Sequence, residues 1–191
     1  MRIIAGQYKS RKIKNLDGEE VRPTLDRVKE SVFNIIGPDI SGARILDLFA
    51  GSGNLGLEAL SRGAVFACFV EKNKRCQRVL LDNIKHLNVS TDSYFIEDNV
   101  FFILEKLYNG GEKFDFIFAD PPYLELVKGE KDRLLVECFL DLINKYCLLA
   151  PEGILIVEHF KEVSLASEME NIFCFRKKKY GIVNVSFYKR R

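Results

Sequence analysis

Hydrophobic positions follow two different periods along this chain, one typical of buried strands and one typical of helices. Short and nearly continuous apolar runs predict strands at residues 44–50, 65–71, 93–97, 114–120, 153–160, 172–178 and 182–189. Apolar residues at helical spacing predict helices between them, at residues 54–62, 73–87, about 99–108, and 131–147. Alternation of this kind implies right-handed crossovers, so we expect an α/β fold with a mostly parallel sheet covered on both faces.

The two ends of the chain add an element each to this core. Residues 2–16 interleave apolar and basic side chains around Gly6, which predicts a short β-hairpin, and we therefore expect residues 1–20 to be a basic extension of a main domain at 21–191. At the other end only Tyr180 and Gly181 separate the last two strands. These strands should form an antiparallel hairpin and make the sheet mixed.

One more helix is predicted before the first strand. Pro23 and Thr24 mark its start, apolar residues repeat at helical spacing from Leu25, and Gly37 followed by Pro38 ends it.

Length and composition limit the class of protein. The chain has 191 residues, 47% of them hydrophobic, which is enough to bury a substantial core in one domain. No apolar run is long enough to span a membrane and the first residues do not resemble a signal peptide, so we expect a soluble, cytoplasmic protein. Five widely spaced cysteines, without a C-x-x-C pair and with only two histidines, indicate neither disulfides nor a metal site.

The formal charge of +2 hides an uneven distribution along the chain. Residues 1–15 hold five basic and no acidic side chains, and residues 176–191 hold seven basic and none acidic, whereas the remainder has 17 basic and 27 acidic residues. This asymmetry favours a polyanionic partner held by the two ends, and solvated surface charge is the alternative.

A glycine-rich turn follows the first strand of the alternating core. Asp47 interrupts an otherwise apolar strand, and Gly51, Gly53 and Gly56 match the G-x-G-x-x-G spacing that lets a backbone approach a nucleotide at a helix N-terminus. That spacing alone is a weak signal, because an ordinary strand-to-helix turn also contains glycines.

Carboxylates recur at the ends of the next two strands, where ligands bind in an open α/β sheet. Glu71 is placed to accept both hydroxyls of a ribose, or else it simply begins a helix. Asp98 could accept a hydrogen bond from the 6-amino group of adenine, or it could cap the helix that follows.

The fourth strand runs directly into Asp120, Pro121, Pro122 and Tyr123. Two prolines fix the backbone and remove two N–H donors, so the carbonyls of Asp120 and Pro121 stand beside a carboxylate and a phenol. Such a pocket accepts the hydrogens of an amino group on a planar base, and Tyr123 can stack on the ring.

These motifs together resemble one family. The segments RIIAGQYKSRKI, RPTLDRVKESVFNII, DLFAGSGNLGLEALSRGA, FDFIFADPPY and YGIVNVSFYKR are similar to those of the RsmD family, which methylates the 2-amino group of one guanine in bacterial 16S rRNA. The resemblance covers essentially the whole chain and implies a Rossmann-like class I fold with S-adenosylmethionine as cofactor. Departures are Asn54, where family members often have alanine, and the charged loop LVKGEKDR after Tyr123.

The resemblance also implies roles for individual residues. By this resemblance, the methionine part and sulfonium of the cofactor are bound by Asp47, Phe49, Ala50, Gly51, Ser52 and Gly53. Glu71 is expected to bind its ribose and Asp98 its adenine. The target base is expected to be bound by Asp120, Pro121, Pro122 and Tyr123. From the basic ends we expect rRNA phosphates to be held by Arg11, Lys12, Arg22 and Arg27. Either naked 16S rRNA or an assembling small subunit could be the partner.

Three other functions compete with this interpretation. An adenine or cytosine amino-methyltransferase shares D-P-P-Y, but this chain lacks an insertion of domain size for reading a DNA duplex. An NAD-dependent dehydrogenase would explain the glycines and Glu71 and leave D-P-P-Y without a role. A non-catalytic RNA-binding module would explain only the basic ends.

Overall fold

The computed structural model describes residues 1–16, 23–122 and 134–191, with the side chains of residues 23–25 left out. The chain divides into two compact units, Met1–Asp98 and Asn99–Arg191. The predicted boundary between residues 20 and 21 falls outside the described residues, and it stays a prediction.

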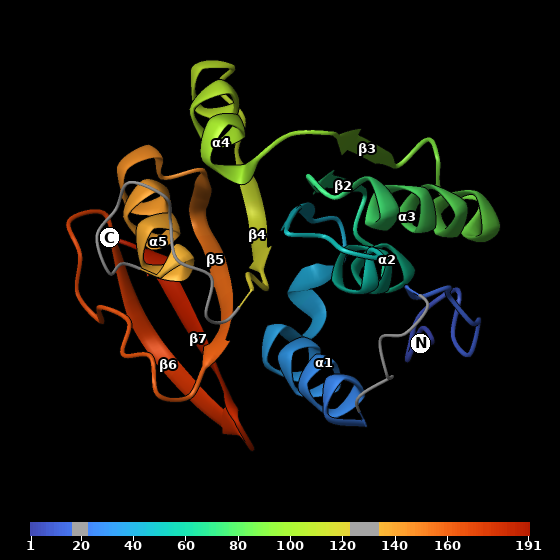
Figure 1. The fold of residues 1–191 in the computed structure, drawn as a ribbon, viewed down its shortest axis with the longest axis horizontal. Helices are drawn as coiled ribbons and strands as arrows, with labels where there is room; N and C mark the ends of the chain where they lie inside the picture. The colour runs from blue at the N-terminus through green and yellow to red at the C-terminus, as the bar shows by residue number, and fades with distance from the viewer. Residues whose placement is uncertain (17–22, 123–133) are drawn as a thin grey trace. The chain divides into compact units, whose positions relative to one another are not determined.

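The first unit is built from parallel strands and their crossover helices. Its elements are α1 (Pro23–Ile36), the 3-10 helix η1 (Gly37–Ile40), β1 (Arg44–Leu48), α2 (Asn54–Ser61), β2 (Phe66–Val70), α3 (Lys74–Leu87) and β3 (Ser93–Ile96) (Figure 1). β2 pairs in parallel with β1 on one side and with β3 on the other. Because the strands are parallel, the carboxyl ends of β1 and β2 lie at one edge of the sheet, where the glycine turn begins.

The residues that form this unit explain its shape. β1 and β2 are buried from their second residue onward, as their apolar runs predict. α3 begins where the Asn73 side chain accepts a hydrogen bond from the N–H of Arg75, and it ends at Asn88, which adopts the left-handed conformation common at helix ends. α1 begins at Pro23, as the sequence predicted.

The N-terminal segment, defined here as residues 1–16, is less regular than the predicted hairpin. Arg2 and Lys12 form a single antiparallel bridge, and the N–H groups of Ile3 and Ser10 donate to the carbonyls of Arg11 and Ile3. Its two sides therefore run antiparallel without forming regular strands.

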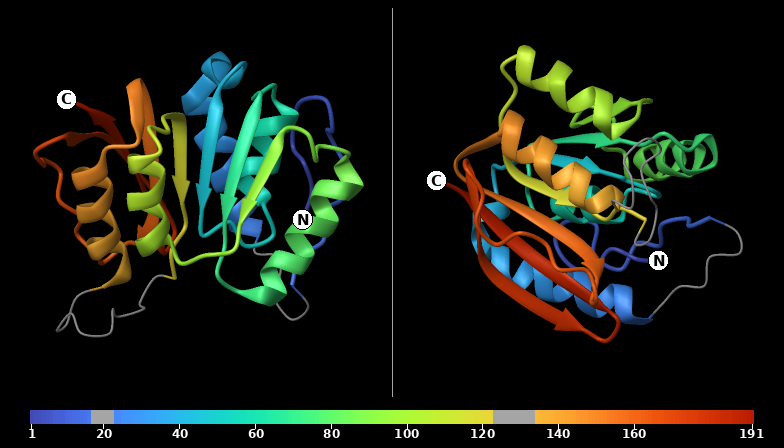
Figure 2. Two further views of the ribbon diagram at one scale, coloured as in Figure 1. Left: turned by 90° about the horizontal axis from the view of Figure 1, so that it is seen from above. Right: turned by 60° about the vertical axis from the view of Figure 1, so that its left-hand side comes forward.

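The second unit contains α4 (Val100–Asn109), β4 (Phe114–Ala119), α5 (Leu135–Tyr146), β5 (Leu149–Phe160), β6 (Ile172–Tyr180) and β7 (Val183–Arg190). Its strand order is β4-β5-β7-β6, with β4 and β5 parallel and the other two pairs antiparallel. β6 and β7 run side by side as a long ribbon (Figure 2), which is the predicted C-terminal hairpin.

Two elements of this unit differ from their predicted bounds. β5 begins at Leu149 rather than at residue 153, because the chain bulges between the pairs Phe114↔Leu149 and Phe116↔Ile154 and then rejoins the strand. Gly153 lies in this bulge, where a Cβ atom would stand only 2.9 Å from the Phe114 carbonyl oxygen. α5 begins at Leu135, and the predicted start of this helix at residue 131 lies outside the described residues.

The predicted fold class is confirmed. Among the described residues, three strand pairs within the units are parallel and two are antiparallel. The antiparallel pairs are at the C-terminus, and helices connect the parallel strands. In the part of the chain that the structure describes, none of the helices is long and apolar enough to cross a membrane.

Candidate active site

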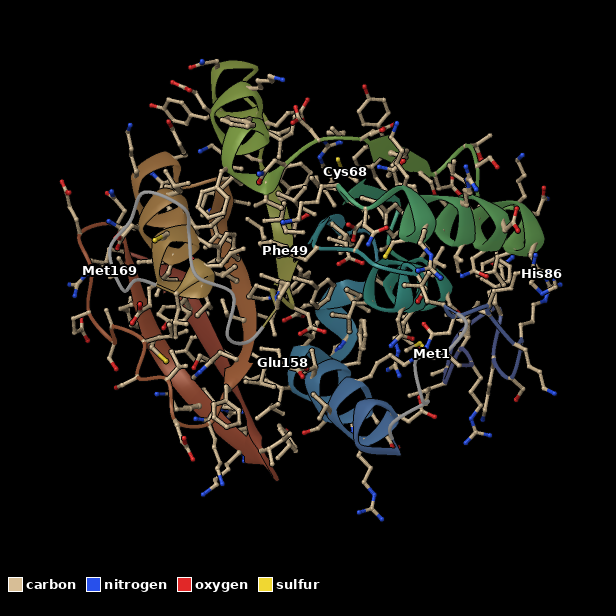
Figure 3. The ribbon with its side chains drawn as sticks, viewed as in Figure 1. Met1, Phe49, Cys68, His86, Glu158 and Met169 are labelled. Atoms are coloured by element: carbon tan, nitrogen blue, oxygen red, sulfur yellow. The ribbon has the colours of Figure 1, made fainter. Side chains whose placement is uncertain are left out.

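The turn between β1 and α2 has an unusual backbone. Phe49, Gly51 and Gly53 have φ angles of 61°, 55° and 84°, all in the left-handed region. Glycine adopts that region at little cost, whereas a bulky residue such as Phe49 is strained there, and strained residues cluster at functional sites. Figure 3 labels Phe49, which directly follows β1. The backbone conformation of the predicted cofactor turn thus depends on having glycine at positions 51 and 53.

Asp47 anchors this turn from inside β1. Its buried Oδ2 accepts a hydrogen bond from the N–H of Gly56 at 2.8 Å, which ties the strand to the first turn of α2. A Cβ at Gly56 would stand 2.3 Å from the Phe69 ring, so this close approach requires glycine. Burial raises the pKa of Asp47 to about 8, although the hydrogen bond from Gly56 opposes the shift.

Glu71, which directly follows β2, anchors the same turn. Its carboxylate accepts hydrogen bonds from the N–H of Gly51 at 2.9 Å and from the N–H of Asn73 at 2.7 Å, and the residue is only 8% exposed. The structure therefore brings together Asp47, the Phe49–Gly53 turn and Glu71. Glu71 does more than begin a helix, since one of its oxygens holds the glycine turn.

Asp98 follows β3 and is partly buried. The alternative that it caps the next helix is wrong, because Asn99 is the N-cap of α4 and its side chain accepts a hydrogen bond from the N–H of Phe101 at 3.1 Å. The adenine role of Asp98 stays a prediction.

The D-P-P-Y segment leaves the end of β4 in the second unit. β4 ends at Ala119, after which Asp120 is partly buried, Pro121 is buried and Pro122 is exposed. Tyr123 lies outside the described residues. The catalytic roles predicted for this segment stay predictions.

The residues predicted to hold RNA phosphates are exposed where the structure describes them. Arg11 and Lys12 lie in the N-terminal segment and Arg27 lies on α1, whereas Arg22 falls outside the described residues. The guanidinium carbon of Arg11 stands 5.3 Å from the centre of the Tyr8 ring, a distance suited to a cation–π contact.

A buried charge cluster that the sequence analysis missed holds the N-terminal segment to α2. The fully buried carboxylate of Glu58 accepts hydrogen bonds from the N–H groups of Ile4 at 2.8 Å and Ala5 at 3.0 Å. It also pairs with Arg62 at 2.8 Å and with Lys29 at 3.3 Å. One carboxylate thereby fixes two backbone amides and two cations.

Lys29 is the counterpart of Glu58 on α1. Only 1% of this residue is exposed, and its ammonium group donates to the Arg2 carbonyl at 2.8 Å and to Asn54 Oδ1 at 2.7 Å. Burial lowers the pKa of Lys29, while Glu58 raises it. Asn54, the departure from the family pattern, therefore gives the Lys29 ammonium a hydrogen-bond acceptor that alanine would lack.

Asn83 makes a second link between the N-terminal segment and the cofactor turn. Its side chain accepts from the N–H of Lys14 at 2.8 Å and donates to the carbonyls of Lys14 at 3.0 Å and Ser52 at 2.9 Å. The predicted extension and the predicted cofactor turn are thus bonded to one buried amide. Figure 1 shows the N-terminal segment beside α2 and α3.

A sequence signal for these residues did exist. Glu58 interrupts the buried run of α2 between Leu57 and Ala59, and Lys29 falls four residues before Phe33 on the buried stripe of α1. A charge on an apolar helix face must find a partner inside the protein.

No group of three His, Cys, Asp or Glu side chains suited to a metal ion occurs among residues 1–16, 23–122 and 134–191.

Comparisons with known proteins cover the same length of chain as the motifs. The family model described as "Conserved hypothetical protein 95" matches residues 1–189. The chain is 38% identical over 191 residues to YlbH of Bacillus subtilis (strain 168), covering 100% of both chains. It is 35% identical to "Ribosomal RNA small subunit methyltransferase D" of Escherichia coli (strain K12), covering 100% of this chain and 90% of the relative.

Solved structures agree with these matches. The structure of yhhF from Escherichia coli has a TM-score of 0.82 and 35% identity, and covers 100% of this chain and 98% of its own. The structure of SMU.776, described as a methyltransferase complexed with S-adenosylhomocysteine, has a TM-score of 0.70 at 15% identity and covers 88% of this chain and 50% of its own, which shows likeness of fold alone. Full-length relatives above 30% identity confirm the resemblance, and the chain belongs to the RsmD family, that of ribosomal RNA small subunit methyltransferase D.

Proposed function

We propose that this protein transfers a methyl group from S-adenosylmethionine to the exocyclic 2-amino group of a guanine in 16S rRNA. The observation that carries the proposal is a pair of buried carboxylates in a chain of the RsmD family: Asp47 in β1 accepts from the N–H of Gly56, and Glu71, just after β2, accepts from the N–H of Gly51. The reaction belongs in the bacterial cytoplasm, where 16S rRNA is found, and we propose an assembling small subunit as well as naked rRNA as partner.

The geometry around Glu71 suits the ribose of this cofactor. A carboxylate has about four lone-pair positions, and Gly51 and Asn73 use two of them, so two remain for the two ribose hydroxyls. Asp47 and the Phe49–Gly53 turn would hold the methionine part, and Asp98 the adenine. Burial disfavours the ionised form of Asp47, and a positively charged ligand nearby would stabilise that form.

Asp120 and the residues after it would hold the target base. Pro121 and Pro122 lack an N–H, so the carbonyls before them and the Asp120 carboxylate can accept the two amino hydrogens and direct the nitrogen lone pair away from the acceptors. Tyr123 would stack on the base.

The bound cofactor supplies a methyl group on a cationic sulfur, and the N–C bond forms as the C–S bond breaks and its electron pair stays on sulfur. The nitrogen then gives up one proton, to Asp120 or to water. No covalent bond to the protein is needed, so these residues act by positioning the base in a site that excludes water.

Single-turnover methyl transfer, measured beside cofactor affinity, tests these roles. Asp120→Ala should slow transfer on the order of 100-fold, because a misplaced nucleophile loses about that much. Tyr123→Ala should weaken RNA binding by about 1 to 3 kcal/mol, whereas its matched control Tyr123→Phe keeps the ring and most of the activity. Cofactor affinity should stay at the parental value in all three variants. Transfer by Asp120→Ala at the parental rate would refute the amino-group mechanism.

A further inference from the structure

The outer strand of the C-terminal hairpin is exposed over five consecutive residues. We define these as the β6 strip: Phe175, Arg176, Lys177, Lys178 and Lys179. Because neighbouring residues of a strand point to opposite faces, exposure of every residue means that solvent reaches both sides of the strand. The paired strand β7 is buried from Val183 to Tyr188, so the strip is the outer margin of a well-packed sheet.

The edge of this sheet is open along the strip and covered before it. The N–H of Cys174 donates to the Ser167 carbonyl at 2.7 Å, and Glu168 forms an antiparallel bridge with Phe173. Beyond Cys174, no described strand pairs with this outer edge of β6, which is the last strand of its unit. The open edge therefore begins where the basic residues begin.

Charge in the second unit is strongly segregated. Residues 172–191 contain seven basic and no acidic side chains, whereas residues 99–171 contain fourteen acidic and seven basic ones. Like charges gathered on one ribbon create a local positive potential that attracts polyanions. This local potential is stronger than the net charge of +2 for the whole chain would suggest.

Phe175 adds an aromatic surface to these charges. It is the extra residue where the pairing of β6 with β7 shifts between Cys174 and Arg176, and 39% of it is exposed. The ammonium of Lys189 stands 5.7 Å from the centre of its ring. An exposed ring among cations is the combination on which single-stranded nucleic acids stack and are neutralised.

We propose that the β6 strip binds a single-stranded segment of RNA along its open edge, with basic side chains of the strip on phosphates and Phe175 stacked on a base. The inference rests on the proposed function in that RNA is the substrate. It assigns to the C-terminal hairpin an RNA contact in addition to those proposed for the D-P-P-Y segment and for Arg11 and Lys12.

Lysines on an edge strand can also have a role that does not involve RNA. Charged residues on an edge strand also prevent it from pairing with a second chain. Charge reversal separates the two roles, because glutamate protects an edge as lysine does and repels phosphate. Replacement by glutamine removes both functions at once.

The experiment measures binding of fluorescent poly(U) to the full chain across a salt series, beside cofactor affinity, thermal unfolding and oligomeric state. Poly(U) reports phosphate and stacking contacts without requiring the methylation site. The variants are Lys177→Glu with Lys179→Glu, the same pair changed to glutamine, and Phe175→Ala. A control with the same change of charge is Arg78→Glu with Lys85→Glu on the exposed face of α3.

Two phosphate contacts to a single strand contribute about 0.7 each to the log–log salt slope, so both lysine pairs should flatten it by roughly 1.4. Phe175→Ala should weaken binding by roughly 5- to 150-fold, the range of one lost stacked base. Cofactor affinity and the slope of the control should match the parent. A charge-reversed pair that binds poly(U) with the parental slope would overturn the proposal, as would self-association of the glutamine pair with unchanged RNA binding. If poly(U) binding depends on the strip and 16S rRNA is not methylated, the proposed function fails and the RNA surface stands.

Discussion

Glu58 offers the sharpest test of how this fold holds its N-terminal segment. Changing Glu58→Gln keeps the size of the side chain and removes its charge. The amide nitrogen of glutamine then faces one of the two N–H groups, of Ile4 or Ala5, that the carboxylate now accepts. The ammonium of Lys29, buried to 99%, also loses its counter-charge.

The expected loss follows from the chemistry of a broken buried pair. Removing one partner of such a pair costs about 3 to 5 kcal/mol, because the other charge stays buried without compensation. For a chain of this length each kcal/mol lowers the unfolding temperature by roughly 2 to 4 °C, so the midpoint should fall by roughly 6 to 20 °C. Calorimetry or urea unfolding measures this loss.

Two further measurements isolate the cause. Hydrogen exchange at the amides of Ile4 and Ala5 should become faster in Glu58→Gln. The double variant Glu58→Gln with Lys29→Met should be more stable than Glu58→Gln alone, since it removes the buried ammonium that has lost its counter-charge. A folded Glu58→Gln protein whose unfolding free energy lies within about 1 kcal/mol of the parent would show that the cluster does not hold the segment.

Three other predictions concern the cofactor turn and the RNA contacts. Glu71→Ala should weaken S-adenosylmethionine binding roughly 10- to 150-fold by calorimetry, because hydrogen bonds to a charged group contribute about 1.5 to 3 kcal/mol; unchanged affinity would remove Glu71 from the site. Arg11→Ala with Lys12→Ala should flatten the salt slope of single-stranded RNA binding by roughly 1.4 with cofactor affinity intact, and an unchanged slope would make both residues solvated surface. Asp47 has a pKa raised from 3.8 to about 8, so the folded state binds more protons between these values and this group's contribution to stability should fall as pH rises from about 4 to about 8. Asp47→Asn should remove that dependence in urea unfolding at several pH values, and a variant with the parental pH profile would contradict the shift.

The parts of this fold that could be predicted are those that local sequence determines. The apolar runs of β1 and β2 are buried on both faces as expected, and the strand pattern predicted the antiparallel hairpin around Gly181. The glycine turn could also be predicted, because its geometry requires glycine and the sequence shows glycine there. Gly53 has a left-handed φ angle, and Gly56 approaches Phe69 too closely for any side chain.

The parts that could not be predicted depend on partners far apart in the chain. Nothing near Glu58 in the sequence indicates that it accepts the amides of Ile4 and Ala5, more than fifty residues away. Asn83 is an ordinary polar residue in its helix until the fold brings Lys14 and Ser52 to it. The bulge of β5 depends likewise on the neighbouring strand, since only the pairing with Phe114 adds Leu149 to the strand.

The central claim is that this protein methylates a guanine amino group of 16S rRNA. The most direct measurement incubates the protein with S-[methyl-3H]adenosylmethionine and 16S rRNA, as naked RNA and as assembling particles in parallel, and then separates the labelled nucleosides and maps the labelled position. The account predicts label in N2-methylguanosine at one guanine in at least one of the two substrates. Label in an adenine or cytosine nucleoside, or no transfer to 16S rRNA in either form, would contradict it.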